Sequence, residues 1–158
     1  IFINDERGLK MQAMRSELRR LKGLHNDLAV VIVDYIQLVS GSDRYVGREQ
    51  EVAEISRHLK QLAGELELTV IACSQLSREV ERRPDKRPLL SDLRESGSIE
   101  QDADLVAFLY RDDYYNDFSE DEGIAELIIK KHRNGPTGVV ELEFHKEQMR
   151  FSDSFRSR

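Results

Sequence analysis

The chain has 158 residues, of which 39% are hydrophobic and 34% charged, a composition typical of one globular domain with a real core. The formal net charge of -6 excludes attraction to phosphate through bulk positive charge, so any contact with nucleic acid must be local. The single cysteine, Cys73, excludes a disulfide framework and fits a reducing compartment, and no apolar run is long enough to span a membrane. We therefore expect a cytoplasmic protein without a membrane partner.

The first half of the chain alternates amphipathic helices with buried strands. Apolar residues at helical spacing predict one helix from Leu9 to about Leu24 and another from Glu49 to about Glu67. Continuous apolar, β-branched runs predict strands over residues 29–33 and 69–73, covered on both faces as in a parallel sheet. The succession of strand, helix and strand predicts a βαβ crossover.

The middle of the chain begins with a charged stretch. Residues 76–90 have no periodicity, which predicts a mobile loop. Ser98-Ile-Glu-Gln101 fits a capping box that opens a short helix, and the apolar run Leu105–Tyr110 predicts a third strand.

The end of the chain has the pattern of an antiparallel hairpin. Strands are predicted over residues 125–133 and 138–145, joined by a turn that contains Asn-Gly-Pro. Together these elements predict the α/β class, with a mostly parallel sheet and a C-terminal antiparallel hairpin, in a single domain over residues 1–158.

Polar residues that end buried strands are the first candidates for a site, because ligands of open α/β sheets bind beyond the carboxyl ends of the strands. Asp34 ends an apolar run in the form of a Walker B strand, which places one carboxylate to hold Mg²⁺ beside a nucleotide phosphate. Gln75 follows the next strand, and its amide can sense a γ-phosphate or orient a water molecule. Taken alone, each residue also fits an ordinary polar strand end.

Two further motifs carry groups that bind phosphate. Lys131 and Arg133 precede the hairpin turn, from which two cations can reach the active site of a neighbouring subunit. The segment 91–97 offers a guanidinium, backbone N–H groups and a flexible glycine. Solvated basic residues and a helix-capping turn are the alternatives. Asp104, before the third strand, is assigned a helix-end or loop role.

Several long blocks of sequence carry a family resemblance. They are Val31-Ile-Val-Asp-Tyr-Ile-Gln-Leu38, Ser74-Gln-Leu-Ser-Arg78, residues 86–104, residues 109–115 and Lys131-His-Arg-Asn-Gly-Pro-Thr-Gly138. These blocks closely resemble DnaB-type replicative helicases, over nearly the whole chain. The resemblance implies a RecA-like P-loop NTPase core in a homohexameric ring that hydrolyses ATP with Mg²⁺ and moves 5′ to 3′ on single-stranded DNA. It also implies contacts with primase and with a helicase loader.

The resemblance implies a role for each candidate residue. Asp34 would be the Walker B acid that holds Mg²⁺, and Gln75 would couple the γ-phosphate to the DNA-contacting loops. Lys131 and Arg133 would reach the triphosphate of the neighbouring subunit. The central-channel loop that follows the DNA backbone would contain three of the candidates: Arg94, Glu95 and Gly97.

One motif of the family is absent from the sequence. No G-x-x-x-x-G-K-[ST] loop occurs, none of the nine glycines precedes a lysine, and Asp34 is followed by Tyr35 rather than by a catalytic glutamate. In the family these features lie upstream, so we expect a C-terminal piece that alone neither binds ATP tightly nor unwinds DNA. A sheet edge and apolar surface that a complete domain covers should then be exposed.

Two alternative functions stay open at the level of the sequence. A RadA-like recombination ATPase shares the core, but we would expect Lys-Asn-Arg-Phe-Gly where this chain has Lys-His-Arg-Asn-Gly. A non-catalytic module that docks on DNA, primase or a loader would also lack the phosphate loop.

Overall fold

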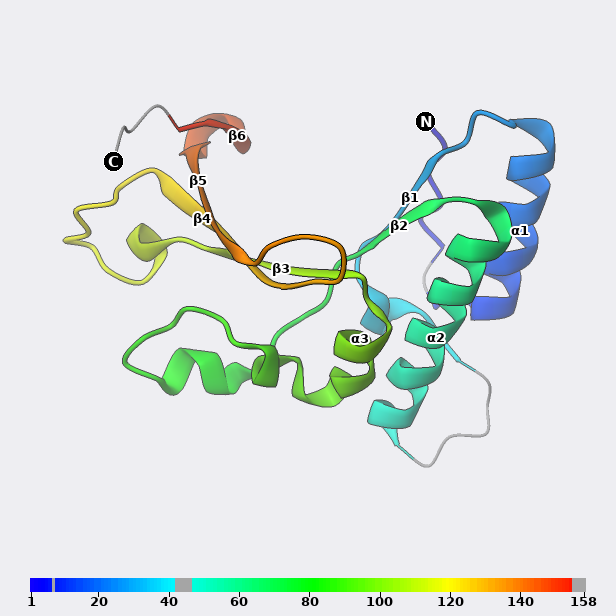
Figure 1. Ribbon diagram of the computed structural model, residues 1–158, viewed down its shortest axis with the longest axis horizontal. Coiled ribbons are helices and arrows are strands. Elements are labelled where there is room, and N and C mark those ends of the chain that lie inside the picture. Colours follow the sequence, from blue (N-terminus) through cyan, green and yellow to red (C-terminus); the bar gives the residue numbers. More distant parts are fainter. Residues whose placement is uncertain (7, 42–46, 155–158) are drawn as a thin grey trace. The chain divides into compact units, whose positions relative to one another are not determined.

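The computed structural model describes residues 1–6, 8–41 and 47–154, and of residues 94–96 it describes the backbone alone (Figure 1). These residues form two compact units, each built from two segments of the chain. The first unit contains Ile1–Arg78 and Ser91–Ala103. The second contains Glu79–Leu90 and the chain from Asp104 onward.

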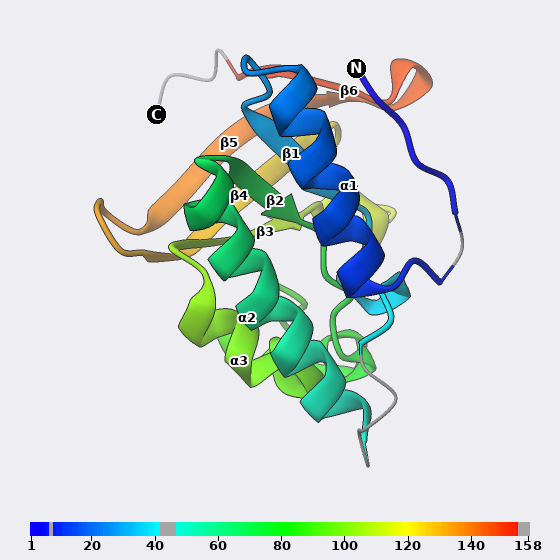
Figure 2. The same ribbon diagram turned by 90° about the vertical axis from the view of Figure 1, so that its right-hand side faces the viewer.

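The first unit is a parallel strand pair with two long helices on one face. Strands β1 (Val30–Val33) and β2 (Thr69–Ala72) are joined through α2 (Arg48–Leu66), which confirms the predicted βαβ order. Helix α1 (Met11–Leu24) precedes β1, and Figure 2 shows it beside α2. The predicted bounds of all four elements differ from the observed ones by one or two residues.

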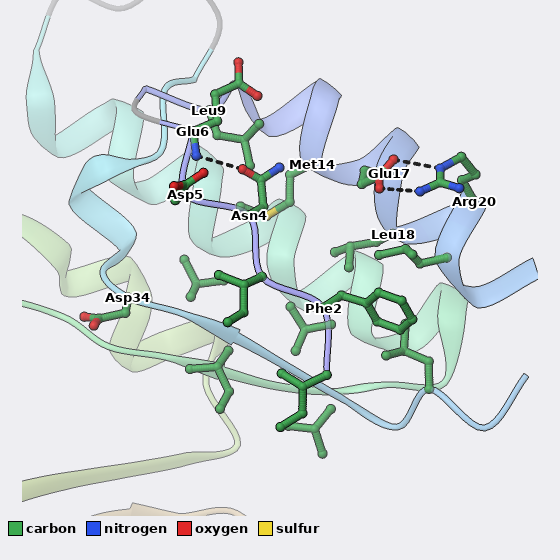
Figure 3. A pocket seen from close by; sticks show the side chains of 18 of the residues that line it. Phe2, Asn4, Asp5, Glu6, Leu9, Met14, Glu17, Leu18, Arg20 and Asp34 are labelled. Carbon is green, nitrogen blue, oxygen red and sulfur yellow. Dashed lines mark hydrogen bonds and ion pairs between the residues drawn. The ribbon is translucent and has the colours of Figure 1, made fainter. Parts of the chain in front are cut away.

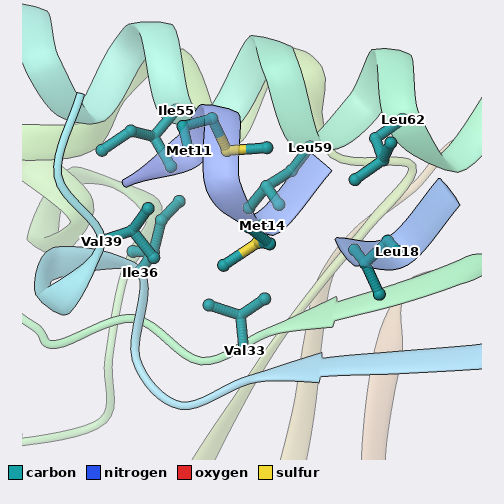
Figure 4. Close-up of a cluster of buried hydrophobic side chains, with 9 residues drawn as sticks. All are labelled: Met11, Met14, Leu18, Val33, Ile36, Val39, Ile55, Leu59 and Leu62. Carbon is teal, nitrogen blue, oxygen red and sulfur yellow. The ribbon is translucent and has the colours of Figure 1, made fainter. Parts of the chain in front are cut away.

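The core of the first unit lies between these helices and β1. The predicted apolar stripes of both helices point into it, together with Val33 of β1 and residues of the 3-10 helix η1 (Ile36–Leu38) (Figure 4). Its buried members are Met11, Met14, Leu18, Val33, Ile36, Val39, Ile55, Leu59 and Leu62. Alternation along a strand sends every second side chain to the other face.

That other face of the strand pair is exposed. Val30, Ile32 and Ile71 keep 47%, 66% and 49% of their surface open to solvent, because the two long helices of the first unit pack on the opposite face. Within the first unit, the prediction that both faces of these strands are covered is therefore wrong. Apolar side chains are therefore exposed on this face of the strand pair.

The second unit is an antiparallel meander of four strands in sequence order. Strands β3 (Leu105–Tyr110), β4 (Ile124–His132) and β5 (Gly138–His145) are followed by a short strand, β6 (Arg150–Asp153). The predicted hairpin is confirmed as β4 and β5, and β3 and β6 flank it. Opposite β3, strand β4 contains one extra residue, Lys130, because Val106 pairs with Lys131 and Ala107 with Ile129.

The charged stretch of residues 76–90, which its composition predicts to be a loop, contains a short helix and an anchoring ion pair. Arg78–Arg82 form the 3-10 helix η2, and the Arg87 guanidinium donates to both carboxylate oxygens of Glu126 at 3.0 and 2.6 Å. The same guanidinium lies 4.7 Å from the centre of the Tyr110 ring. A bidentate ion pair and a cation–π contact thus fix this segment to β4 and β3.

Helix α3 (Gly97–Asp102) follows the 3-10 helix η3 (Leu90–Ser96) without a break. Ser98 therefore lies inside the helix rather than at its N-cap, and the predicted capping box is wrong. Ser56 of α2 donates to Asp102 of α3 at 2.8 Å, which ties the two helices together. Among the residues described here, no helix is both long and apolar enough to cross a lipid bilayer.

Candidate nucleotide and DNA site

Asp34 and Gln75 lie at the same edge of the strand pair, as the sequence predicts. Beyond the last ladder position the chains stay in register, because the Cys73 amide donates to the Val33 carbonyl at 2.9 Å. The Ile36 amide then donates to the Cys73 carbonyl, also at 2.9 Å. Asp34 therefore lies beside Cys73 at the carboxyl end of the strands. Gln75 follows Cys73 by two residues.

The Asp34 carboxylate is exposed at the end of β1 (Figure 3). No hydrogen bond to this carboxylate is found among the described residues. The peptide bond between Asp34 and Tyr35 is cis. Mg²⁺ binds through one or two carboxylates, retains several waters and takes substrate phosphates as further ligands. An exposed carboxylate beyond a parallel strand fits this demand.

Gln37, in η1, holds the main chain that leads to Gln75. Its amide nitrogen donates to the Ser74 hydroxyl at 3.0 Å, and its amide oxygen accepts from the Gln75 N–H at 3.3 Å. The backbone of Gln75 is thus fixed while its side chain is exposed. Sequence reasoning missed Gln37, and its place three residues after Asp34 was the only available signal.

The N-terminal end of α2 also holds η1 in place. Arg48 donates to the Gln37 carbonyl and to the Glu51 carboxylate, and Glu51 accepts the Gly41 N–H at 2.9 Å. The Gly41 amide, followed by the Arg48 guanidinium, lowers the pKa of Glu51 from its ordinary value. The carboxylate is therefore charged at neutral pH and completes a chain of bonds between α2 and the strand ends.

The segment with the DNA-binding candidates is joined to the chain that follows β2 and contains Gln75. The Ser77 N–H donates to the Asp92 carbonyl at 2.9 Å, and Asp92 and Leu93 are both 4% exposed. Gly97 is exposed at the first position of α3. The side chains of Arg94 and Glu95 lie outside the described residues, so their predicted contact with DNA stays a prediction.

Lys131 and Arg133 lie together at the end of β4, in the second unit, whereas Asp34 and Gln75 belong to the first. The Arg133 N–H donates to the Asp104 carbonyl at 2.8 Å, and its guanidinium donates to the Asp104 carboxylate at 2.9 Å. Asp104 thus holds both the main chain and the side chain of Arg133. No sequence pattern indicated this partner, which is 29 residues away.

Comparison with known proteins agrees with the predicted fold and with the family resemblance. The family model described as "DnaB-like helicase C terminal domain" matches residues 1–153. The chain is 58% identical to the replicative DNA helicase DnaB of Geobacillus stearothermophilus and 56% identical to the replicative DNA helicase DnaC of Bacillus subtilis. Each match includes 96% of this chain and 33% of the relative. DnaB of Haemophilus influenzae is 52% identical over 100% of this chain and 34% of its own length.

Solved structures of similar proteins have the same fold. A structure described as an ATPase domain superposes with a TM-score of 0.89 at 49% identity, over 93% of this chain and 52% of that one. A structure of a DnaB-like replicative helicase, described with its interactions with primase, superposes with a TM-score of 0.92 at 48% identity. The match covers 96% of this chain and 36% of that one.

These matches favour the helicase over the RadA-like alternative. The chain spans about a third of the length of the curated relatives, so what those whole proteins do is a separate question from what this chain is. Its fold is that of their RecA-like ATPase domain. The chain belongs to the DnaB-like helicase C-terminal domain family.

Proposed function

We propose that the chain is part of one ATPase domain of a replicative helicase, which hydrolyses ATP with Mg²⁺ to move 5′ to 3′ along single-stranded DNA. The observation that carries this proposal is the connected set of groups at the carboxyl edge of the strands. Asp34 and Gln75 share that edge, and the Ser77–Asp92 bond joins it to the segment 90–97. Binding of a phosphate and binding of a DNA strand can therefore both change the position of the same rigid element.

In this proposal Asp34 holds Mg²⁺, which neutralises charge on the triphosphate. Gln75 contacts the γ-phosphate through its amide, and Gln37 keeps its backbone in place. Loss of the γ-phosphate then removes a hydrogen-bond partner of Gln75, and the change reaches Asp92 through Ser77.

The remaining candidates bind DNA and complete the neighbouring subunit's site. Arg94, Glu95 and Gly97 follow the backbone of the single strand in the central channel of a homohexamer. Lys131 and Arg133 reach the triphosphate bound by the next subunit, where cations stabilise charge that develops in the transition state. Six copies of a few well-placed groups bind DNA despite the net charge of -6.

The same proposal places the protein in the cytoplasm with the replication machinery. Primase and a helicase loader are its proposed partners, and one structural neighbour is a helicase described with primase. Alone, the chain lacks a phosphate-binding loop, so we expect it neither to bind ATP tightly nor to unwind DNA.

A chimaera tests the proposal, because it supplies the parts that this sequence lacks. This chain would replace the matching 152-residue segment of the Geobacillus helicase, and DNA-stimulated ATP turnover would be measured. We expect turnover in the chimaera, none in the isolated chain, and a loss of roughly a hundredfold or more for Asp34→Asn. Asp27→Asn, an exposed acid just before β1, is the matched control and should be neutral.

Two results would contradict the proposal. A hexameric chimaera that binds single-stranded DNA without turning over ATP would favour the non-catalytic module. Full turnover in the Asp34→Asn chimaera would show that this carboxylate does not hold the metal.

A further inference from the structure

The turn between β4 and β5 is closed by a ring that packs on a glycine. A Cβ atom added to Gly135 would lie 2.4 Å from Cε1 and 2.6 Å from Nδ1 of His132, far inside van der Waals contact. The Nδ1 atom of the same ring lies 3.3 Å from the Pro136 carbonyl oxygen. The imidazole therefore spans the turn, fixed by contact on one residue and by a hydrogen bond on the next.

This ring belongs to the residue between Lys131 and Arg133. His132 is the last residue of β4, so Lys131 precedes it in the strand and Arg133 follows it as the first residue of the turn. Fixing the imidazole therefore restrains the backbone that carries both neighbours. The extra residue Lys130 lies just before them in β4, and such bulges change the direction of the side chains that follow.

The chain is held at a second point by Asp104, through the two hydrogen bonds to Arg133. One contact comes from Asp104, just before β3, and the other from within the turn, so the short segment 131–136 is held at both ends. A group must be held close to its productive position, since a misplacement of about 1 Å can cost roughly a hundredfold in rate.

We propose that His132, through its contact with Gly135 and Pro136, is a positioning residue for the trans-acting pair Lys131 and Arg133. The proposal rests on the function proposed above, because it assumes that these two cations act on a neighbouring nucleotide. His132 itself touches no nucleotide and acts only through the backbone on either side.

The test is a double-mutant cycle in the hexameric chimaera. Gly135→Ala should push the ring away and lower kcat for ATP by roughly tenfold to a hundredfold, with KM changed by no more than about threefold. In a His132→Ala background the space is empty, so Gly135→Ala should add less than about a twofold loss. His132→Asn keeps a donor near the place of Nδ1 and should retain more turnover than His132→Ala.

Gly138→Ala is the matched control in the same hairpin, because an added Cβ there meets nothing within 4 Å. It should leave kcat within about twofold of the parent chimaera. Additive losses in the double variant, or equal losses at the two glycines, would overturn the positioning role.

Lys131→Ala and Arg133→Ala, measured in the same chimaera, separate this proposal from the one on which it rests. If both variants lose turnover while Gly135→Ala does not, only the positioning role is wrong. If both variants keep full turnover, the trans-acting role itself is wrong.

Discussion

Ser98 lies one residue inside α3, and its hydroxyl is buried without a hydrogen-bond partner among the described residues. An unsatisfied buried hydroxyl costs about 1–3 kcal/mol, and serine is a poorer helix former than alanine. Ser98→Ala should therefore raise the free energy of unfolding by about 1 kcal/mol. Urea denaturation followed by circular dichroism measures this difference.

Ser56→Ala is the control for that prediction, because the Ser56 hydroxyl is satisfied by Asp102 at 2.8 Å. Its removal should lower the free energy of unfolding by about 1 kcal/mol. A Ser98→Ala variant that is destabilised to the same extent would mean that the Ser98 hydroxyl also has a partner.

Residues at the site differ in how far the sequence could identify them. Asp34 and Gln75 were predictable, because each follows an apolar strand and parallel strands end at one edge. Gln37, Asp104 and the His132–Gly135 contact were not, because each depends on which distant or turned segment comes within bonding distance.

At the scale of elements, α1 and α2 are tied by a carboxylate between two guanidinium groups. Arg15 donates to Glu65 at 2.8 Å, and Arg19 donates to the other oxygen. Hydrogen bonds from Arg19 and then Arg15 lower the pKa of Glu65 from 4.5 to about 2. The folded state thus favours the charged form of this group.

This shift predicts how stability depends on pH. A lowered pKa in the folded state stabilises the fold above the ordinary pKa, and the effect is lost as pH falls from 4.5 toward 2. Glu65→Gln should therefore lower the melting temperature at pH 7, and the difference from the parent should vanish near pH 2.

Thermal unfolding of both proteins between pH 2 and pH 7 is the measurement. Glu17→Gln is the matched control, because Glu17 pairs with Arg20 on the same helix and ties no elements together. Its effect at neutral pH should be smaller. A Glu65→Gln difference that is constant across this range would exclude the charge as its cause.

Elements with a strong pattern were predicted well, and those that depend on a partner were not. β3 and β5 have their predicted bounds, because their apolar runs are long or alternate clearly. β6 has only four residues, and it forms because Phe151 packs on Phe144 of β5, with ring centres 4.9 Å apart. The short helix η2 was missed because the charged residues 76–90 show no helical periodicity, and the bond from Arg87 to Glu126 depends on a strand 39 residues away.

For the whole molecule, the uncovered face of the β1–β2 pair should govern association of the isolated chain. Ile32 and Ile71 are 66% and 49% exposed there. Replacing both by threonine keeps the β-branched shape and reduces the apolar surface, so self-association at micromolar concentrations should decrease. Sedimentation velocity over a concentration series measures it.

Val33→Thr is the contrasting variant, because Val33 is only 6% exposed and packs in the core. It should destabilise the fold without improving solubility. A parent chain that remains a monomer over the same concentrations would show that the exposed face does not drive association.

The two units also differ in how far apart in the sequence their paired strands are. Every strand of the β3–β6 sheet pairs with its neighbour in sequence, whereas β1 and β2 come together only after α2 has been spanned. Closing a longer loop costs more entropy, and folding slows as contacts become less local. The four-stranded meander should therefore form first during folding, and the edge that bears Asp34 and Gln75 should form last.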